Sequence, residues 1–305
     1  MSIFDKVLFS GLNWNMNVLT TDKPEEVFDP GFNVNSNNML FFPRNYSSGG
    51  KVCHTISDPF LYAKGDTLYM LFEKQAGGDH GQISMVETTD LIHWKETAIL
   101  KEPFHLSFPF IFEHQGKTYL LPETYYSSEI MLYEFERFPD KLKKVKTLLT
   151  GKFADSVLYL QDGLWFLFTM SEAHEQHLYT SSDLFGAWTL HPQSPICSDQ
   201  RYSRNAGAIV QLNGRLFRVA QDGSHYYGEK LHLMEIIQLT ESAYSERLEQ
   251  ENLFPGRYSW NSLGTHHLSL IEYKNKQVVA LDGLINKRLT PRLAAWLKKV
   301  CFHFR

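Results

Sequence analysis

Ionisable side chains recur at one position of an internal pattern in this 305-residue sequence, the position where each apolar segment begins. Asp58, Asp155 and His266 occupy it in three copies, and Phe108 and Ala206 occupy it in the other two. Two carboxylates and an imidazole that converge on one concave surface can act as general acid and base, because crowding and burial move their pKa values apart. We predict catalytic roles for both aspartates and a substrate contact for His266. An aspartate at a strand start can also simply cap a turn, and the sequence leaves this alternative open.

Polar residues also follow the second apolar segment of most copies. The matching positions hold Glu73, Glu123, Gln221 and Asp282. Glu123 follows a proline in LLPETYY and precedes Tyr125 and Tyr126, whose rings can stack on the face of a sugar. We predict that Glu123 is catalytic and that the other three residues bind substrate. Acidic residues at strand ends are often only solvated, so this second reading also stays open.

Arginines near the fourth copy form a third group of candidates. Arg204 precedes its first apolar segment, and Arg218 lies within its second. An arginine in a buried strand needs an anionic partner, which can be Asp58, Asp155 or a phosphate or carboxylate of the substrate. We predict that both arginines contact substrate, together with Tyr227 from a rim loop with the sequence SHYYG.

Other chemistries find little support in the sequence. Its histidine pairs lack a third ligand at metal-binding spacing, so we predict no metal site. It has no phosphate-cradling glycine motif, and we predict no cofactor. Its three cysteines are far apart and odd in number, which favours a reducing compartment over a disulfide framework. A net charge of -4 gives no basic surface for nucleic acid.

The elements that must position these side chains are short strands in a repeat of about fifty residues. The copies begin at residues 58, 108, 155, 206 and 266. Each has two apolar strands joined by a turn, at Gly65, Gly116, Gly163, Gly214 or Asn275, and most are followed by another strand. Such units are typical of propeller blades, which bury their faces only against their neighbours. We therefore predict an all-β fold, a five-bladed β-propeller over residues 1–283, with the run WNMNVLTT from Trp14 completing the last blade.

Residues 284–305 break this pattern, because they hold six Lys or Arg, no acid and apolar residues at helical spacing. Thr290 and Pro291 form a good helix start, so we predict a short basic amphipathic helix. This helix can pack on the outer wall of the propeller or lie on an anionic membrane surface. The N-terminus lacks a secretory signal and no long apolar run follows, so we expect a cytoplasmic protein with possible membrane association.

Five motifs together resemble a known family. They are ISDPFLYAKGDTLYMLFE, FPFIFEHQGKTYLLPE, FADSVLYL, HPQSPI and SRNAGAIVQLNGRLFRVAQD. From about Trp14 to Asp282 the sequence resembles the N-terminal domain family of plant glucosamine inositolphosphorylceramide transferases. The resemblance implies a five-bladed propeller and an association with glycoconjugate synthesis, but no set of catalytic residues.

The sequence is more distantly similar to the five-bladed arabinanase, xylosidase and invertase superfamily of glycoside hydrolases. Asp58 in SDPF matches the aspartate that opens the superfamily pattern. Phe108 stands where a second aspartate is expected, and Asp155 where a glutamate is expected, which disfavours ordinary hydrolysis.

These observations favour a glycosyltransferase that uses a sugar donor and a glycan or glycolipid acceptor in the synthesis of a cell-surface polysaccharide or glycolipid. The first alternative is a glycosidase with a rearranged carboxylate pair, such as Asp58 with Glu123. The second is a propeller without catalytic activity that binds a glycan or holds a partner enzyme.

Overall fold

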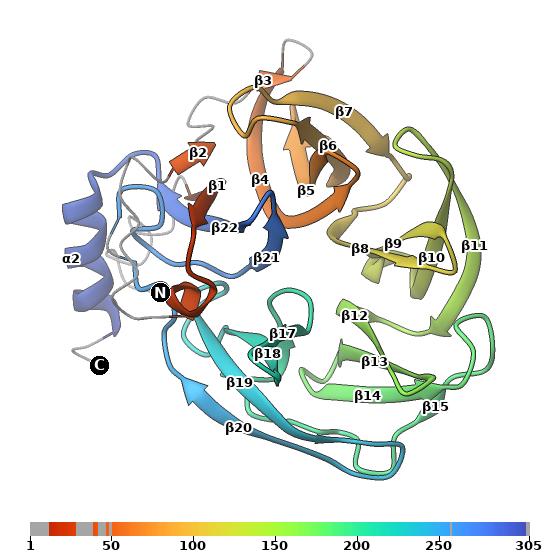
Figure 1. Ribbon diagram of the computed structural model, residues 1–305. Coiled ribbons are helices and arrows are strands. Elements are labelled where there is room, and N and C mark those ends of the chain that lie inside the picture. The colour runs from red at the N-terminus through yellow and green to blue at the C-terminus, as the bar shows by residue number, and fades with distance from the viewer. Residues whose placement is uncertain (1–11, 29–38, 42–46, 49–50, 257, 303–305) are drawn as a thin grey trace.

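The computed structural model describes residues 12–28, 39–41, 47–48, 51–256 and 258–302. Their strands form five antiparallel sheets arranged as blades around a common axis (Figure 1). This arrangement confirms the predicted five-bladed β-propeller.

The blades follow the chain in order. The first contains β3 (Ser47–Ser48), β4 (Lys51–Lys64), β5 (Thr67–Ala76), β6 (Gln82–Thr88) and β7 (Lys95–Leu100). The second contains β8 (Ser107–His114), β9 (Lys117–Glu123), β10 (Glu129–Arg137) and β11 (Lys141–Thr150). The third contains β12 (Phe153–Gln161), β13 (Leu164–Ser171), β14 (Gln176–Ser181) and β15 (Thr189–Leu190). The fourth contains β16 (Arg204–Asn205), β17 (Val210–Leu212), β18 (Arg215–Asp222), β19 (Lys230–Leu239) and β20 (Tyr244–Gln250).

The fifth blade joins the two ends of the propeller. It contains β21 (Leu268–Tyr273), β22 (Lys276–Asn286), β1 (Leu12–Thr21) and β2 (Met39–Phe41). The N-terminal strand β1 pairs with β22 along its whole length, from Leu12 opposite Asn286 to Thr21 opposite Gln277. Its residues Met16, Val18 and Leu19 are fully buried. In the structure the segment around Trp14 thus supplies a strand of the last blade, so strands from the two ends of the propeller share one sheet.

Tight turns connect the first two strands of every repeat, as the sequence predicts. Gly116, Gly163 and Gly214 have φ values of 75°, 80° and 74°, and the residue before each also has a positive φ. Two consecutive residues with positive φ define a type I′ turn, whose twist matches that of the flanking strands. Asn275 takes the same conformation, with φ of 60°.

A backbone irregularity marks the start of the inner strand in three blades. Asp58, Phe108 and Asp155 have φ values of 54°, 44° and 48°, which are unusual for residues other than glycine. At each of them the pairing with the next strand shifts register. A bulge of this kind turns a side chain out of the regular alternation. The same kind of bulge thus occurs at the equivalent position of these three repeats.

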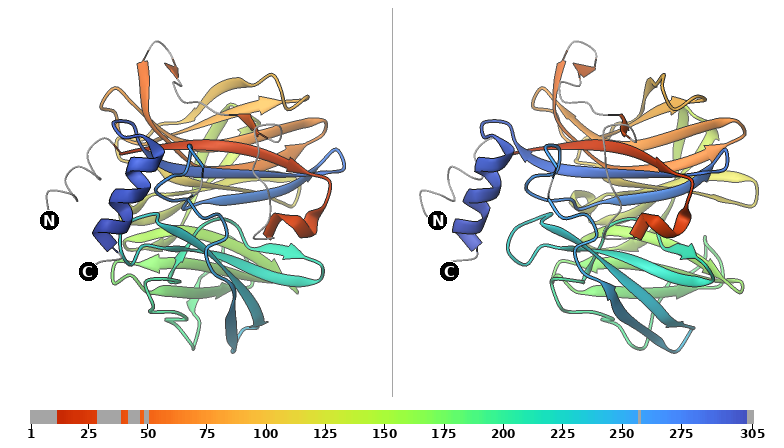
Figure 2. Two further views of the ribbon diagram at one scale, coloured as in Figure 1. Left: turned by 90° about the vertical axis from the view of Figure 1, so that its left-hand side faces the viewer. Right: turned by 60° about the vertical axis from the view of Figure 1, so that its left-hand side comes forward.

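The C-terminal helix α2 (Pro291–Phe302) lies against the fifth blade (Figure 2). The Leu293 N–H donates to Thr290 Oγ1 at 3.3 Å, as expected for a capping threonine. Ala294, Leu297 and Cys301 pack on the propeller, as in the outer-wall alternative, whereas Leu293 and Trp296 are exposed. Phe304 lies outside the described residues, and the structure describes the backbone of Phe302 but not its side chain. In the described part of the chain, no helix is long and apolar enough to cross a membrane.

Candidate active site

A cavity of about 270 Å³ lies where the inner strands begin. Five of the predicted site residues line it: Glu73, Glu123, Arg204, Tyr227 and His266. Asp58, Asp155, Gln221 and Asp282 are buried directly behind these residues and contact them. The fold therefore brings together nine of the ten residues that the sequence predicts.

The carboxylates of this cluster hold the bulges of neighbouring blades. Asp282 accepts a hydrogen bond from the Asp58 N–H at 3.3 Å, and Asp58 accepts one from the Phe108 N–H at 3.1 Å. Glu123 likewise accepts one from the Asp155 N–H at 3.2 Å. Each acid thus accepts a hydrogen bond from a backbone N–H of the next blade. These contacts are of the kind that the turn-capping alternative expects. The same contacts fix the acids in place at the cavity.

His266 bridges two of these acids. Its Nδ1 lies 2.5 Å from Asp282 Oδ2, and its Nε2 lies 3.4 Å from Asp58 Oδ1. Burial would lower the pKa of His266, but the charges of Asp282 and Asp58 outweigh burial and raise it. Burial would raise the pKa of Asp282, but His266 lowers it. Burial raises the pKa of Asp58 to about 8, against the opposing effect of His266. Asp58 therefore keeps its proton at neutral pH, whereas Asp282 carries the negative charge beside His266.

Among the described residues, Asp58, His266 and Asp282 also have ligand atoms close enough to share a metal ion. Each ring nitrogen of His266 already faces a carboxyl group, on opposite sides of the ring. A metal ion there would displace the proton that His266 shares with Asp282. We interpret the trio as a proton-carrying bridge.

A second charged group surrounds Arg204. Its Nε lies 2.6 Å from Asp155 Oδ2, and its Nη2 lies 3.7 Å from Glu123 Oε2. Gln221 donates to the same oxygen of Asp155 at 2.8 Å. Burial and the neighbouring Asp155 raise the pKa of Glu123 well above its usual value, although Arg204 opposes them. The guanidinium carbon of Arg204 also lies 4.9 Å from the ring centroid of Tyr227.

Aromatic rings form one wall of the cavity. Trp14 stacks on His266 with a ring separation of 3.9 Å, and Tyr227 meets the His266 ring edge-on at 5.0 Å. Tyr227 is 47% exposed, so one face is accessible to a ligand. Flat aromatic surfaces beside hydrogen-bonding side chains suit the apolar faces and hydroxyl groups of sugars.

Sequence reasoning missed several lining residues of this cavity, Trp14 and His105 among them. Trp14 marked the start of a strand, and nothing in the sequence indicates that its ring reaches His266. His105 lies between repeats, and its Nε2 is 3.3 Å from Glu73 Oε1. Glu73 also accepts hydrogen bonds from Ser57 and Gln75, at 3.0 and 2.7 Å.

The expectation for the partner of Arg218 needs correction. Arg218 is fully buried, and its Nε and Nη2 lie 2.9 and 2.5 Å from the carboxylate of Glu246 in β20. The hydroxyl of Tyr244 donates to the same carboxylate at 2.7 Å. Arg218 is in the middle of β18 and pairs with β20 of its own blade, whereas Gln221 near the end of β18 reaches the cluster. Arg218 is therefore paired within the protein and does not line the cavity.

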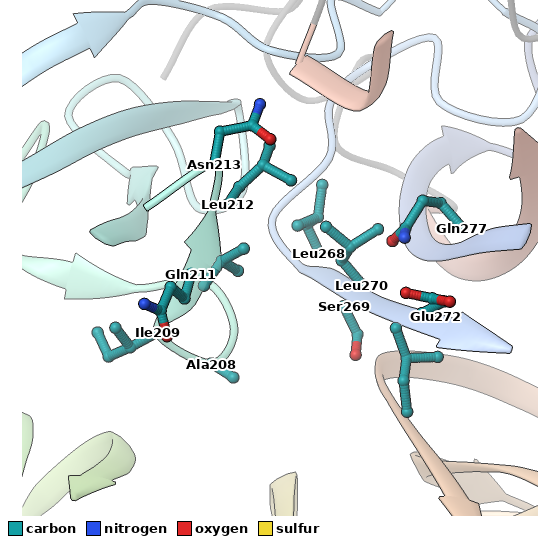
Figure 3. Close-up of a pocket in the computed structure, with 12 residues that line it drawn as sticks. Ala208, Ile209, Gln211, Leu212, Asn213, Leu268, Ser269, Leu270, Glu272 and Gln277 are labelled. Carbon is teal, nitrogen blue, oxygen red and sulfur yellow. The ribbon is translucent and has the colours of Figure 1, made fainter. Parts of the chain in front are cut away.

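Another cavity, of about 400 Å³, lies between β17 and β21 (Figure 3). Its only ionisable lining residue among those described is Glu272. It offers no convergent acid and base groups, so we place the candidate active site at the cavity beside Asp58.

Comparisons with known proteins agree with this architecture. An α-L-arabinofuranosidase from Podospora anserina superimposes with a TM-score of 0.60 at 9% identity, over 78% of this chain and 93% of that chain. An α-L-arabinofuranosidase catalytic domain from Coprinopsis cinerea gives a TM-score of 0.58 at 11% identity, over 74% of this chain and 90% of that chain. At such low identity these likenesses concern the fold alone.

Sequence relatives are more informative about the family. Glucosamine inositolphosphorylceramide transferase 1 from Oryza sativa subsp. japonica is 34% identical over 253 residues, which cover 78% of this chain and 34% of the relative. The protein of the same name from Arabidopsis thaliana is 30% identical over 257 residues, covering 78% of this chain and 33% of the relative. The chain thus spans about a third of the length of these relatives. The model of the N-terminal region of glucosamine inositolphosphorylceramide transferase 1 matches residues 33–283, and the chain therefore belongs to that family.

Proposed function

We propose that this chain is a carbohydrate-active enzyme that transfers a sugar to a glycan or glycolipid acceptor at the cavity beside Asp58. The observation that carries the proposal is the Asp58, His266 and Asp282 bridge at the wall of an aromatic-lined cavity. A carboxyl group whose pKa is near 8 becomes, once ionised, a much stronger base than an ordinary aspartate. The names of the relatives support sugar transfer, and we propose a cell-surface glycan or glycolipid as the acceptor class.

In the proposed reaction an acceptor hydroxyl attacks the anomeric carbon of the donor sugar, and the bond from that carbon to the leaving oxygen breaks. Asp58 accepts the proton of the hydroxyl, and its Oδ1 lies 3.4 Å from Nε2 of the cavity-lining His266. Arg204, which is partly exposed beside the cavity, stabilises negative charge on the leaving group. Trp14 and Tyr227 hold the sugar ring against these groups.

A second candidate is glycoside hydrolysis. Burial raises the pKa values of both Asp58 and Glu123, so one cluster holds two carboxyl groups that keep their protons more readily than ordinary acids. Such a pair suits an acid and a base acting on a glycosidic bond. The third candidate, a propeller that only binds glycans, predicts ligand binding without turnover.

A thermal-shift screen distinguishes these functions. Nucleotide sugars, lipid-linked sugars and free oligosaccharides are tested on the parent protein and on Asp58→Asn, which keeps the size and the acceptor oxygen of the side chain. We expect a sugar donor to stabilise the parent by about 2.7 kcal/mol at one hundred times its Kd, and to lose most of this effect in the variant.

The matched control is Asp162→Asn, which changes an exposed aspartate in a turn where asparagine fits the positive φ. It should behave like the parent with every ligand. Stabilisation by free oligosaccharides alone would favour hydrolysis or glycan binding. If no sugar of any class stabilises the parent, the proposed function is wrong.

A further inference from the structure

Helix α2 contacts a small apolar cluster that reaches the candidate active site. Ala294, Leu297 and Cys301 of the helix are buried with Leu263 and Leu284 of the propeller. Trp14 and Tyr226 pack on the edge of the same cluster. Figures 1 and 2 show the helix on the outside of the fifth blade, beside β1 and β22. The helix also lies beyond residues 33–283, the region that the family shares.

One lysine of the helix turns inward at this contact. The Nζ of Lys298 lies 3.3 Å from Oε1 of the buried Glu229 and donates to the Leu263 carbonyl at 3.3 Å. It also lies 5.3 Å from the ring centroid of Tyr226. Burial lowers the pKa of Lys298, and the charge of Glu229 opposes this effect. Because Lys298 is partly buried and contacts Glu229, the Leu263 carbonyl and Tyr226, it holds these three groups in place.

The partners of Lys298 flank the residue that enters the cavity. Tyr226, whose hydroxyl donates to the Leu263 carbonyl, immediately precedes Tyr227, and Glu229 follows it by two positions. Gly228, between them, has a φ of 75°, and a Cβ atom there would lie 2.3 Å from the Trp14 ring. The loop and Trp14 are therefore in direct contact without space between them. Trp14 in turn stacks on His266, and Tyr227 lies against the guanidinium of Arg204.

We propose that α2 is an internal buttress of the candidate active site and that Lys298 is a positioning residue for Tyr227 and Trp14. Lys298 touches neither the cavity nor any reacting group. It acts by tying both sides of the Tyr227 loop to the helix, so that the aromatic wall stays against His266 and Arg204. The inference concerns the site of the proposed function, but its test needs no ligand. A negative result therefore leaves the proposed function standing, and failure of the ligand screen leaves this inference standing.

The test compares Lys298→Met with Lys299→Met in the full chain. Lys299 is the next residue and is exposed, so the pair removes the same charge from the same helix. The first readout is hydrogen exchange of the peptide 224–231, whose Glu229 amide donates to the Asp222 carbonyl at 3.3 Å. We expect Lys298→Met to speed this exchange by about tenfold, because local opening becomes easier by that factor. Lys299→Met should leave it unchanged.

The second readout is the fluorescence of Trp14, isolated by subtracting the spectrum of Trp14→Phe. A stacked histidine ring quenches indole emission, so loosening of the contact between Trp14 and His266 should brighten Trp14 in Lys298→Met only. Lys298→Arg keeps the charge and should restore both signals toward those of the parent. A helix that merely stabilises the fold would lower the melting temperature without a selective change in the loop or in Trp14.

Unchanged exchange and unchanged Trp14 emission in Lys298→Met would overturn the proposal, as would equal changes in Lys299→Met. If Lys298→Met does not fold, Glu229→Gln removes the other half of the ion pair, together with the contacts of Glu229 to His225 and Lys230, and is expected to give the same two signals. Their absence in that variant would be equally decisive.

Discussion

The variant Asp58→Asn is expected to lose sugar-transfer activity by a factor of about 10² to 10⁴, the usual contribution of a general base. Asparagine has the same shape and keeps an oxygen that can accept the hydrogen bond from the Phe108 N–H, which is 3.1 Å away in the parent. The bulge of the second blade should therefore persist, and only the ability to take a proton should disappear. The measurement is kcat/KM with the donor and acceptor that the ligand screen identifies.

The same residue predicts how activity depends on pH. Asp58 faces His266, His267, Asp282, Glu73, Asp155 and Tyr227, and its pKa is raised to about 8. A base works only when it is ionised, so kcat/KM should rise about tenfold per pH unit from pH 6 and level off above pH 8. A hydrolytic acid at this position would give the opposite slope. The profile of Asp58→Asn should be flat over this range, and an unchanged slope in that variant would assign the titration to another group.

The variant Arg218→Met is expected to lower the free energy of unfolding by about 3 to 5 kcal/mol while leaving ligand binding intact. Removing one partner of a buried ion pair leaves the other charge uncompensated, which is the cause of so large a loss. Here the remaining charge would be Glu246, supported only by the Tyr244 hydroxyl among the contacts described for it. Urea unfolding measures the loss of stability, and the rise in melting temperature on adding the ligand measures binding.

Arg204→Met is the matched comparison, because it removes another arginine paired with buried carboxylates. Asp155 and Glu123 would lose their cation, so this variant should be both less stable and unable to bind the donor. Arg218→Met should therefore affect stability alone, whereas Arg204→Met should affect both stability and donor binding. Loss of donor binding in a folded Arg218→Met protein would contradict the placement of Arg218 outside the site.

Much of the fold can be predicted from the sequence because its signals are local and repeated. A glycine or asparagine at each hairpin adopts a positive φ that other residues resist, so Gly116 and Asn275 mark turns wherever the chain goes. The helix start at Thr290 and Pro291 is local in the same sense. Equivalent positions in a closed ring must face the same axis, so the repeat alone predicts that Asp58 and Asp155 lie near one another.

The sequence alone determined the repeat, its turns, the closing strand and most of the acids that converge on the axis. The partner of each charge follows only from the contacts of the folded ring. Arg204 and Arg218 are fourteen positions apart in one repeat, yet one lies beside Asp155 at the cavity and the other pairs with Glu246 of its own blade, away from the cavity. Trp14 reaches His266 across 252 positions of sequence. The reason is physical: periodicity and turn chemistry act within a few residues, whereas contacts across the ring exist only after the last strand closes it.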